Sequence, residues 1–187
     1  MANPLYTIGH STRSLDDFIT LLAGAGIERL IDIRTVPRSR SNPQFNRDTL
    51  PAALAAHGIA YGHMADLGGL RGKSKTVPPD VNGYWENDSF HHYADYALSA
   101  AFRQGLSALI AQGQAQPTAM MCSESVWWRC HRRIVADHLI ALGIPVFHIM
   151  GAGRLDPANL TPGAVIRDDG TVMYPGPAAA ENATASP

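Results

Sequence analysis

The sequence has almost no excess of charge of either sign, and it contains few cysteines. The 15 lysines and arginines nearly balance 16 acidic residues, which leaves a formal net charge of −1, so no overall basic field exists to hold a nucleic-acid backbone non-specifically. Two cysteines are too few for the disulfide framework of a small secreted domain. No apolar run approaches the ~20 residues of a membrane span, and the first residues lack the pattern of a signal peptide. We therefore expect a cytoplasmic protein with no membrane partner and with reduced thiols.

Length and composition indicate one globular domain. The chain has 187 residues, of which 45% are hydrophobic and 17% are charged, which suits a single core and argues against global disorder. The last twelve or so residues are rich in proline, alanine and serine. We expect one domain over residues 1–175 and a flexible tail over residues 176–187.

Short apolar runs alternate with longer amphipathic segments. The apolar runs predict strands at residues 5–9, 30–33, 59–64, 118–121 and 145–149. Helical patterns lie between them, from Ser14 to residues 24–26, from residue 48 or 49 to Gly58, and over residues 93–112 and 128–142. This alternation predicts an α/β fold with a mostly parallel five-stranded sheet and helices on both faces. Residues 164–166 and 171–174 flank Asp168-Asp169-Gly170, which predicts a C-terminal hairpin.

The polar peculiarities of the chain follow the predicted strands. They occupy residues 9–11, 34–40, 65–71, 122–128 and 150–153, and residues 67–88 form a long loop with too many glycines and prolines for regular structure. Ligands of open α/β sheets bind beyond the carboxyl ends of the strands, and a loop of this length usually serves binding or closure. We therefore expect Arg34, one of Arg38 and Arg40, Arg71 and the segment after Cys122 to border one pocket.

Cys122 is the first candidate for chemistry. It follows a buried type of strand and precedes a predicted helix, whose free N–H groups would favour its thiolate, although cysteine is also a common small core residue. Glu124 is either a general acid or base beside this thiol or a cap of the helix. We predict that Cys122 is the more reactive cysteine and that Cys130 is packed and slow.

Cys130, His131 and Arg132 fall in the first turns of the predicted helix. Successive helical residues point about 100° apart, so Cys130 and His131 would not share one small ligand. Either these side chains divide between core and surface, or His131 or Arg132 reaches the site while Cys130 is packed beneath it or serves as a resolving thiol. His131 joins Cys122 and Glu124 as a candidate catalytic residue.

Two familiar kinds of site fit the spacing poorly. Cysteine-dependent phosphatases place five residues between cysteine and arginine, whereas residues 123–128, six residues, separate Cys122 from Arg129. Structural zinc sites usually space two thiols as C-x₂₋₄-C, whereas seven residues, 123–129, separate Cys122 from Cys130. His10, His63 and His148 could complete a metal site only through the fold. No metal ligand and no cofactor is assigned.

Arginines interleaved with hydroxyl groups follow the second predicted strand. This pattern suits a phosphate or a carboxylate, although it is also typical of a solvated loop. Asp32 lies within the apolar strand, so it needs a partner, and a nearby arginine is the simplest one. Glycines in the long loop would let its backbone approach a ligand. The candidate substrate-binding residues are Asp32, Arg34, Arg38, Ser39, Arg40, Gly68, Gly69, Arg71 and Arg132.

Four blocks of the sequence resemble a known family in order. They are YTIGHSTRSLDDFITLL, LIDIRTVPRSRSNPQFN, YGHMADLGGLRG, and CSESVWWRCHRRIVADHL with VFHIMG. The chain resembles the family called domain of unknown function 488 over residues 5–151. It departs from that family's usual Cys-Ala-Glu at Cys122-Ser123-Glu124, and from a frequent proline before Cys-His-Arg. The resemblance implies a site but no activity, and it carries that site onto Asp32, Arg34, Pro37, Ser39, Arg40, Phe45, Gly68, Gly69, Cys122, Glu124, Cys130, His131 and Arg132.

Two functions remain open from the sequence. The first is an enzyme acting on a small anionic or nucleotide-like substrate, with Cys122 as nucleophile or sulfur carrier, Glu124 as acid or base, and arginines as the anion clamp. The second is a non-catalytic metal- or nucleic-acid-binding module that uses the same Cys, Glu, His and Arg cluster. The sequence assigns no oligomeric state.

Overall fold

The apolar runs form the strands of one sheet in the computed structural model, which describes residues 2–176. The strands are β1 (Leu5–Gly9), β2 (Arg29–Asp32), β3 (Ala60–His63), β4 (Thr118–Cys122), β5 (Val146–Gly151) and β6 (Arg154–Pro157). Their order across the sheet is β3-β2-β4-β1-β5-β6. The first five are parallel to one another, as predicted, and β6 pairs antiparallel with β5. The sixth strand was not predicted, because Arg154–Pro157 is mostly exposed and contains a proline.

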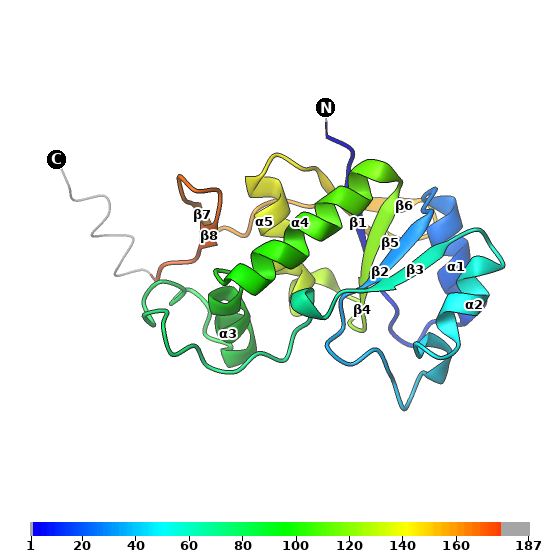
Figure 1. Ribbon diagram of the computed structural model, residues 1–187, viewed down its shortest axis with the longest axis horizontal. Helices are drawn as coiled ribbons and strands as arrows, with labels where there is room; N and C mark the ends of the chain where they lie inside the picture. The colour runs from blue at the N-terminus through cyan, green and yellow to red at the C-terminus, as the bar shows by residue number, and fades with distance from the viewer. Residues whose placement is uncertain (1, 177–187) are drawn as a thin grey trace.

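Five helices accompany the sheet in the described residues (Figure 1). They are α1 (Leu15–Gly24), α2 (Leu50–Ala55), α3 (Asp88–Tyr96), α4 (Ala100–Ala115) and α5 (Arg132–Ala141). Ser14 caps α1 as expected, since its side chain accepts a hydrogen bond from the backbone N–H of Asp17. Short 3₁₀ turns lie at Pro43–Phe45, Ala65–Leu67 and Trp127–Arg129.

Two predicted helices differ from those observed. The segment 93–112 is two helices, because Ser99 accepts a hydrogen bond from the N–H of Phe102 and so starts α4 anew. The segment 128–142 begins four residues late: Trp127–Arg129 is a 3₁₀ turn and Cys130 is extended, so α5 starts only at Arg132. The later start decides which cysteine meets the amino end of the helix.

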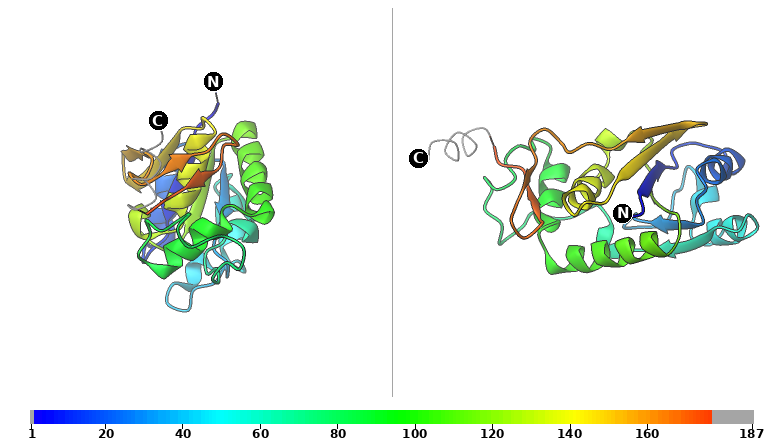
Figure 2. Two further views of the ribbon diagram at one scale, coloured as in Figure 1. Left: turned by 90° about the vertical axis from the view of Figure 1, so that its left-hand side faces the viewer. Right: turned by 90° about the horizontal axis from the view of Figure 1, so that it is seen from above.

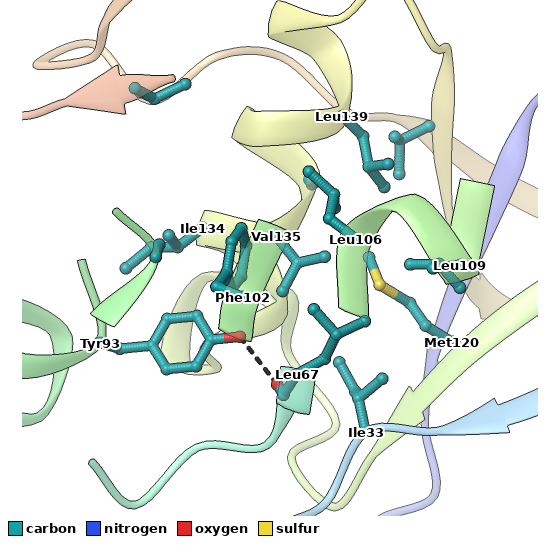
Figure 3. Close-up of a cluster of buried hydrophobic side chains, with 14 of the residues drawn as sticks. Ile33, Leu67, Tyr93, Phe102, Leu106, Leu109, Met120, Ile134, Val135 and Leu139 are labelled. Carbon is teal, nitrogen blue, oxygen red and sulfur yellow. Dashed lines mark hydrogen bonds between the residues drawn. The ribbon is translucent and has the colours of Figure 1, made fainter. Parts of the chain in front are cut away.

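Alternating residues of the strands divide the core into two clusters, one on each face of the sheet. Leu30, Met121 and Ile8 pack with α1 and α2, whereas Ile31, Met120 and Leu5 pack with α3, α4 and α5. In the second cluster the hydroxyl of Tyr93 donates to the carbonyl of Leu67 at 2.8 Å (Figure 3), which ties the long loop to α3. Helices therefore cover both faces, as predicted.

The predicted C-terminal hairpin is present as β7 (Val165–Ile166) and β8 (Val172–Met173). It lies at the end of the molecule opposite α1 and α2 (Figures 1 and 2). Tyr174 anchors it, because the tyrosine hydroxyl donates to Asp137 of α5 at 2.6 Å. Of the expected tail, residues 177–187 lie outside the described part of the chain. Within residues 2–176, none of the helices combines the length and the apolar character that a membrane crossing requires.

The connections reverse direction at the centre of the sheet. The chain leaves β1 for β2 and β3 on one side, then returns through β4 on its way to β5 and β6 on the other. Gly9 and Cys122, the last residues of β1 and β4, are partners in the parallel register. Cys122 therefore lies at the topological switch point, where open α/β sheets bind their ligands.

Candidate active site

A cavity of about 540 Å³ opens beyond the carboxyl ends of β2 and β4. It collects residues from the segment after β2, the glycine-rich loop, α3 and the segment between β4 and α5. Its lining residues are Arg34, Thr35, Val36, Arg38, Ser39, Gly69, Leu70, Ser89, Phe90, Tyr93, Cys122, Ser123, Glu124, Arg129, Cys130 and His131. Arg34, Arg38 and the segment after Cys122 thus converge as predicted, whereas Arg71, which was expected at the same pocket, lies outside the lining.

Both cysteines lie on this cavity, and Arg132 contacts both sulfur atoms. Arg132 Nη1 donates to Cys122 Sγ at 2.7 Å, and the backbone N–H of Arg132 donates to Cys130 Sγ at 3.4 Å. The rest of the guanidinium holds the intervening segment, since it donates to the carbonyls of Glu124 at 2.5 Å and Ser125 at 3.0 Å. One arginine therefore organises both thiols and the backbone between β4 and α5.

The charge of Arg132 has no carboxylate partner within residues 2–176. The side chain is fully buried, and its Nε finds no hydrogen-bond partner there. A buried cation without a counter-ion is strongly unfavourable. Among the hydrogen-bond partners of Arg132 within residues 2–176, the two sulfur atoms are the groups that can ionise to an anion, so a thiolate at this centre would balance its charge.

The two thiols divide this role unequally. Burial, together with hydrogen bonding to Cys130, raises the pKa of Cys122 well above its usual range. Burial also acts to raise the pKa of Cys130, but the hydrogen bond from Cys122 and the charge and N–H of Arg132 outweigh it and lower this pKa to about 7. The directions of these two pKa shifts are opposite to the expectation that Cys122 carries the favoured thiolate, because the late start of α5 directs the free N–H of Arg132 to Cys130.

His131 completes the neighbourhood of Cys130. Its Nε2 donates to the carbonyl of Ile33 at 3.1 Å, which leaves the lone pair of Nδ1 facing Cys130 Sγ at 3.6 Å. Burial lowers the pKa of His131, which favours the neutral ring. The expectation that Cys130 and His131 point apart is wrong, because neither residue lies within the regular turns of α5. His131 is thus placed to accept or return the proton of Cys130.

Arg34 lines the cavity but is largely engaged by the protein. Its Nε and Nη2 donate to the carboxylate of Asp32 at 2.9 and 2.7 Å, and Nη2 also donates to the carbonyl of Phe45. The expected pairing of Asp32 with a neighbouring arginine is confirmed. The hydroxyl of Tyr61 donates to the same carboxylate at 2.6 Å. Asp32 itself is fully buried and does not reach the cavity.

Two exposed arginines lie at the cavity without such partners. Arg38 and Arg129 both line it, and neither forms an ion pair within the described residues. Arg40 and Arg71 lie outside the lining. Arg71 is held elsewhere, because its guanidinium donates to the carbonyls of Gly68 and Ala65 and stacks on the ring of Tyr96.

The glycines of the long loop bring its backbone against the strand ends. A Cβ on Gly68 would overlap Thr35, and the Thr35 hydroxyl donates to the carbonyl of Gly69 at 2.5 Å. Gly69 lines the cavity, whereas Gly68 supports it from outside. Leu70, the next residue, has a left-handed backbone (φ +56°) and is 88% exposed. Strained, exposed residues of this kind concentrate at functional sites.

Some of the remaining predicted residues line the cavity, and others lie outside it and support its walls. Ser39, Glu124 and His131 line the cavity, and Glu124 does not cap α5, whose N-cap position is His131. Arg132 supports the site from beneath. Of the two further residues that the resemblance implies, Phe45 is buried and stacks on His10 at 4.4 Å, and the carbonyl of Pro37 accepts a hydrogen bond from the N–H of Arg47. Neither lines the cavity.

Several lining residues were missed from the sequence. Arg129 was considered as a nearby positive charge but was not named among the binding residues, and Thr35 and Val36 lie within the segment already suspected. Ser89, Phe90 and Tyr93 carry no sequence signal, because only the packing of α3 brings them to the cavity. In the part of the chain that the structure describes, no three His, Cys, Asp or Glu side chains gather in a way that could hold a metal ion.

Fold and site together define an α/β protein with a cysteine–arginine centre at the switch point of its sheet. The family model described as domain of unknown function DUF488 matches residues 14–139. The chain belongs to this family. A comparison with curated proteins finds no match.

Proposed function

We propose that this protein is a cysteine-dependent enzyme that acts on a small anionic substrate in the cavity beyond β2 and β4. Cys130 is the nucleophile and Cys122 is the thiol that shares its proton. The observation that carries the proposal is that one buried arginine, Arg132, contacts both sulfur atoms and, among residues 2–176, forms no ion pair with a carboxylate. Such an arrangement keeps a thiolate ionised, and the thiolate is the nucleophilic form of cysteine.

The surroundings assign roles to three further side chains. The neutral His131 faces Cys130 with a free Nδ1 lone pair, so it removes the thiol proton when Cys130 is protonated and returns it to a leaving group. Glu124, exposed at the cavity, is a second acid or base toward substrate. Tyr93 packs edge-on against His131, with ring centroids 4.9 Å apart, and fixes the orientation of the imidazole.

The charges of the lining support an anionic substrate. Arg38 and Arg129 are exposed and unpaired within the described residues, whereas Glu124 is the only carboxylate that lines the cavity. Guanidinium groups bind carboxylates and phosphates through paired N–H donors. Arg34 adds a third positive group, although Asp32 neutralises most of its effect.

Competing alkylation of the native protein tests this proposal. Iodoacetate carries a charge that iodoacetamide lacks, so the ratio of their rates at Cys130 reports the local field independently of the intrinsic reactivity of the thiol. We expect a higher ratio than for free cysteine, and a fall in the ratio for Arg38→Gln and Arg129→Gln of up to about fivefold each, the effect of one charge at contact in water.

Arg40→Gln is the matched control, because Arg40 is exposed in the same segment as Arg38 but lies outside the cavity lining. It should leave the ratio unchanged. An equal ratio in the wild type, Arg40→Gln and the Arg38/Arg129 double variant would contradict an anion site at the thiols. A non-catalytic binding module would then account better for the same residues.

A further inference from the structure

The two cysteines approach a common point from opposite ends of one short segment. Cys122 ends β4, and Cys130 is the extended residue just before His131 and α5. Arg132 closes the segment between them through the carbonyls of Glu124 and Ser125, and contacts both sulfur atoms. Both thiols are free and line the same cavity. A nucleophile with a second thiol at hand is the arrangement that resolves a mixed disulfide.

We propose that Cys122 and Cys130 are a thiol–disulfide exchange pair that reacts with small anionic disulfides and closes to an internal disulfide. This inference rests on the proposed function, because it uses the same nucleophile and the same arginines. Arg38 and Arg129 bind the anionic groups of the disulfide, and the exposed side chains of Val36 and Leu70 contact its apolar part.

The reaction balances in two steps. The Cys130 thiolate attacks one sulfur of R–S–S–R, which forms a mixed disulfide and releases one R–S⁻. The Cys122 thiol then loses its proton to His131 or to solvent and attacks the Cys130 sulfur, which releases the second R–S⁻ and forms the Cys122–Cys130 disulfide. The two protein thiols are oxidised by two electrons, and one small disulfide is reduced to two thiols.

Arg132 sets the direction of this equilibrium. In the dithiol form the shared thiolate balances the buried guanidinium, whereas the internal disulfide carries no charge and leaves Arg132 without a counter-ion. The same burial therefore favours the reduced pair, and the disulfide should be readily opened by thiols. A couple whose reduced form is stabilised in this way is oxidising. The site is thus inactivated by anionic disulfides and restored by small thiols.

The test uses 5,5′-dithiobis(2-nitrobenzoate), an anionic aromatic disulfide, at less than one equivalent per native protein. The internal disulfide is expected to release two nitrothiobenzoate ions per reagent, to retain no adduct, and to lower the protein mass by two hydrogens. The Cys122→Ser variant should release one ion per reagent and keep a stable adduct on Cys130, while Cys130→Ser should react much more slowly. A wild-type protein that keeps an adduct on either cysteine, or does not react, would overturn the proposal.

A second measurement addresses the role of Arg132. Equilibration with reduced and oxidised glutathione should show that Arg132→Met forms the internal disulfide at least about tenfold more readily than wild type, the equivalent of one pKa unit of lost thiolate stabilisation. Arg132→Lys retains the charge and should lie near wild type. Equal equilibria for all three proteins would overturn the assigned role.

The two proposals can fail separately. An adduct that persists on Cys130, combined with arginine-dependent selectivity for iodoacetate, removes the exchange pair and leaves the anion-directed nucleophile. Disulfide closure without any selectivity for iodoacetate removes the anion site of the proposed function and leaves the exchange pair.

Discussion

Arg34 and Asp32 form a two-pronged ion pair, with Nε and Nη2 at 2.9 and 2.7 Å from the carboxylate oxygens, and neither side chain is more than 7% exposed. The pair joins the end of β2 to the carbonyl of Phe45 and to the hydroxyl of Tyr61. It fixes the backbone from which Thr35, Arg38 and Ser39 reach the cavity. Its main role is therefore to position the site rather than to bind substrate.

Loss of this pair should be costly. Asp32→Asn leaves the buried Arg34 charge uncompensated, so we expect the free energy of unfolding to fall by about 3–5 kcal/mol. Asp156→Asn is the control, because it removes the partner of the exposed Arg154 and should cost at most about 1 kcal/mol. Urea denaturation measures both. A similar small loss for the two variants would mean that solvent compensates Arg34.

The alkylation rate of Cys130 should follow its lowered pKa of about 7. Only the thiolate reacts, so the rate with iodoacetamide should rise as pH increases through 7 and level off about one unit above it. Cys122, whose pKa is raised by burial and by Cys130, should stay protonated and slow over this range. Peptide mapping at each pH separates the two cysteines. Faster labelling of Cys122, or a rise that begins only near the pKa of free cysteine, would contradict the assignment.

His138 should make the protein sensitive to acid. Burial lowers its pKa from 6.5 to about 4, and its Nε2 has no hydrogen-bond partner in the described residues. Between these two values the unfolded chain binds a proton that the folded chain does not, so stability falls as pH drops from about 6.5 to about 4. In His138→Leu, the decrease in the free energy of unfolding over this pH range should be smaller than in wild type by about 3 kcal/mol.

Thermal unfolding of His138→Leu at pH 7 and pH 4 checks this expectation. The exposed His57 supplies the control, since His57→Gln should leave the acid-induced loss of stability as in wild type. An unchanged loss in His138→Leu would show that His138 is protonated in the folded state.

Gly9 is required by the close approach of β1 to the segment after β4. A Cβ at this position would overlap the carbonyl of Glu124, which also accepts a hydrogen bond from Arg132. Gly9→Ala should therefore displace the segment, lower the melting temperature and slow alkylation of Cys130. Gly24→Ala is the control, because its Cβ would meet open space at the end of α1. A Gly9→Ala protein with wild-type stability would contradict the packing.

The parallel sheet was predictable because its strands are short, apolar and punctuated by turn residues. β6 could not be found in this way, since Arg154–Pro157 has no buried face and therefore shows no alternation of apolar and polar residues. The break between α3 and α4 carried a readable signal in Ser99, a good N-cap residue that lies inside an otherwise continuous helical pattern. The sequence signal for the start of α5 was weaker, because the aromatic and apolar residues before Arg132 are as compatible with a helix as the residues that follow it.

Within the site, the positions of Arg34, Arg38, Cys122 and Glu124 followed from the rule that ligands bind at strand ends. The proposed division of roles between the cysteines did not follow. It depends on the orientation of the Arg132 side chain toward Cys122 and on the free backbone N–H of Arg132 directed at Cys130. Both result from packing and cannot be read from the spacing of residues in the sequence.

The position of β1 at the centre of the sheet has a consequence for synthesis of the protein. Both neighbours of β1 are made long after it, since β4 begins at Thr118 and β5 at Val146. On the ribosome, the emerging chain can pair β2 with β3, but β1 has two open edges until the second half of the chain appears. Pairing over such sequence separations is slow, and open strand edges favour association with other chains. The nascent chain is therefore most vulnerable to aggregation before β4 emerges, and Cys122 takes its place at the cavity only after β4 docks beside β1.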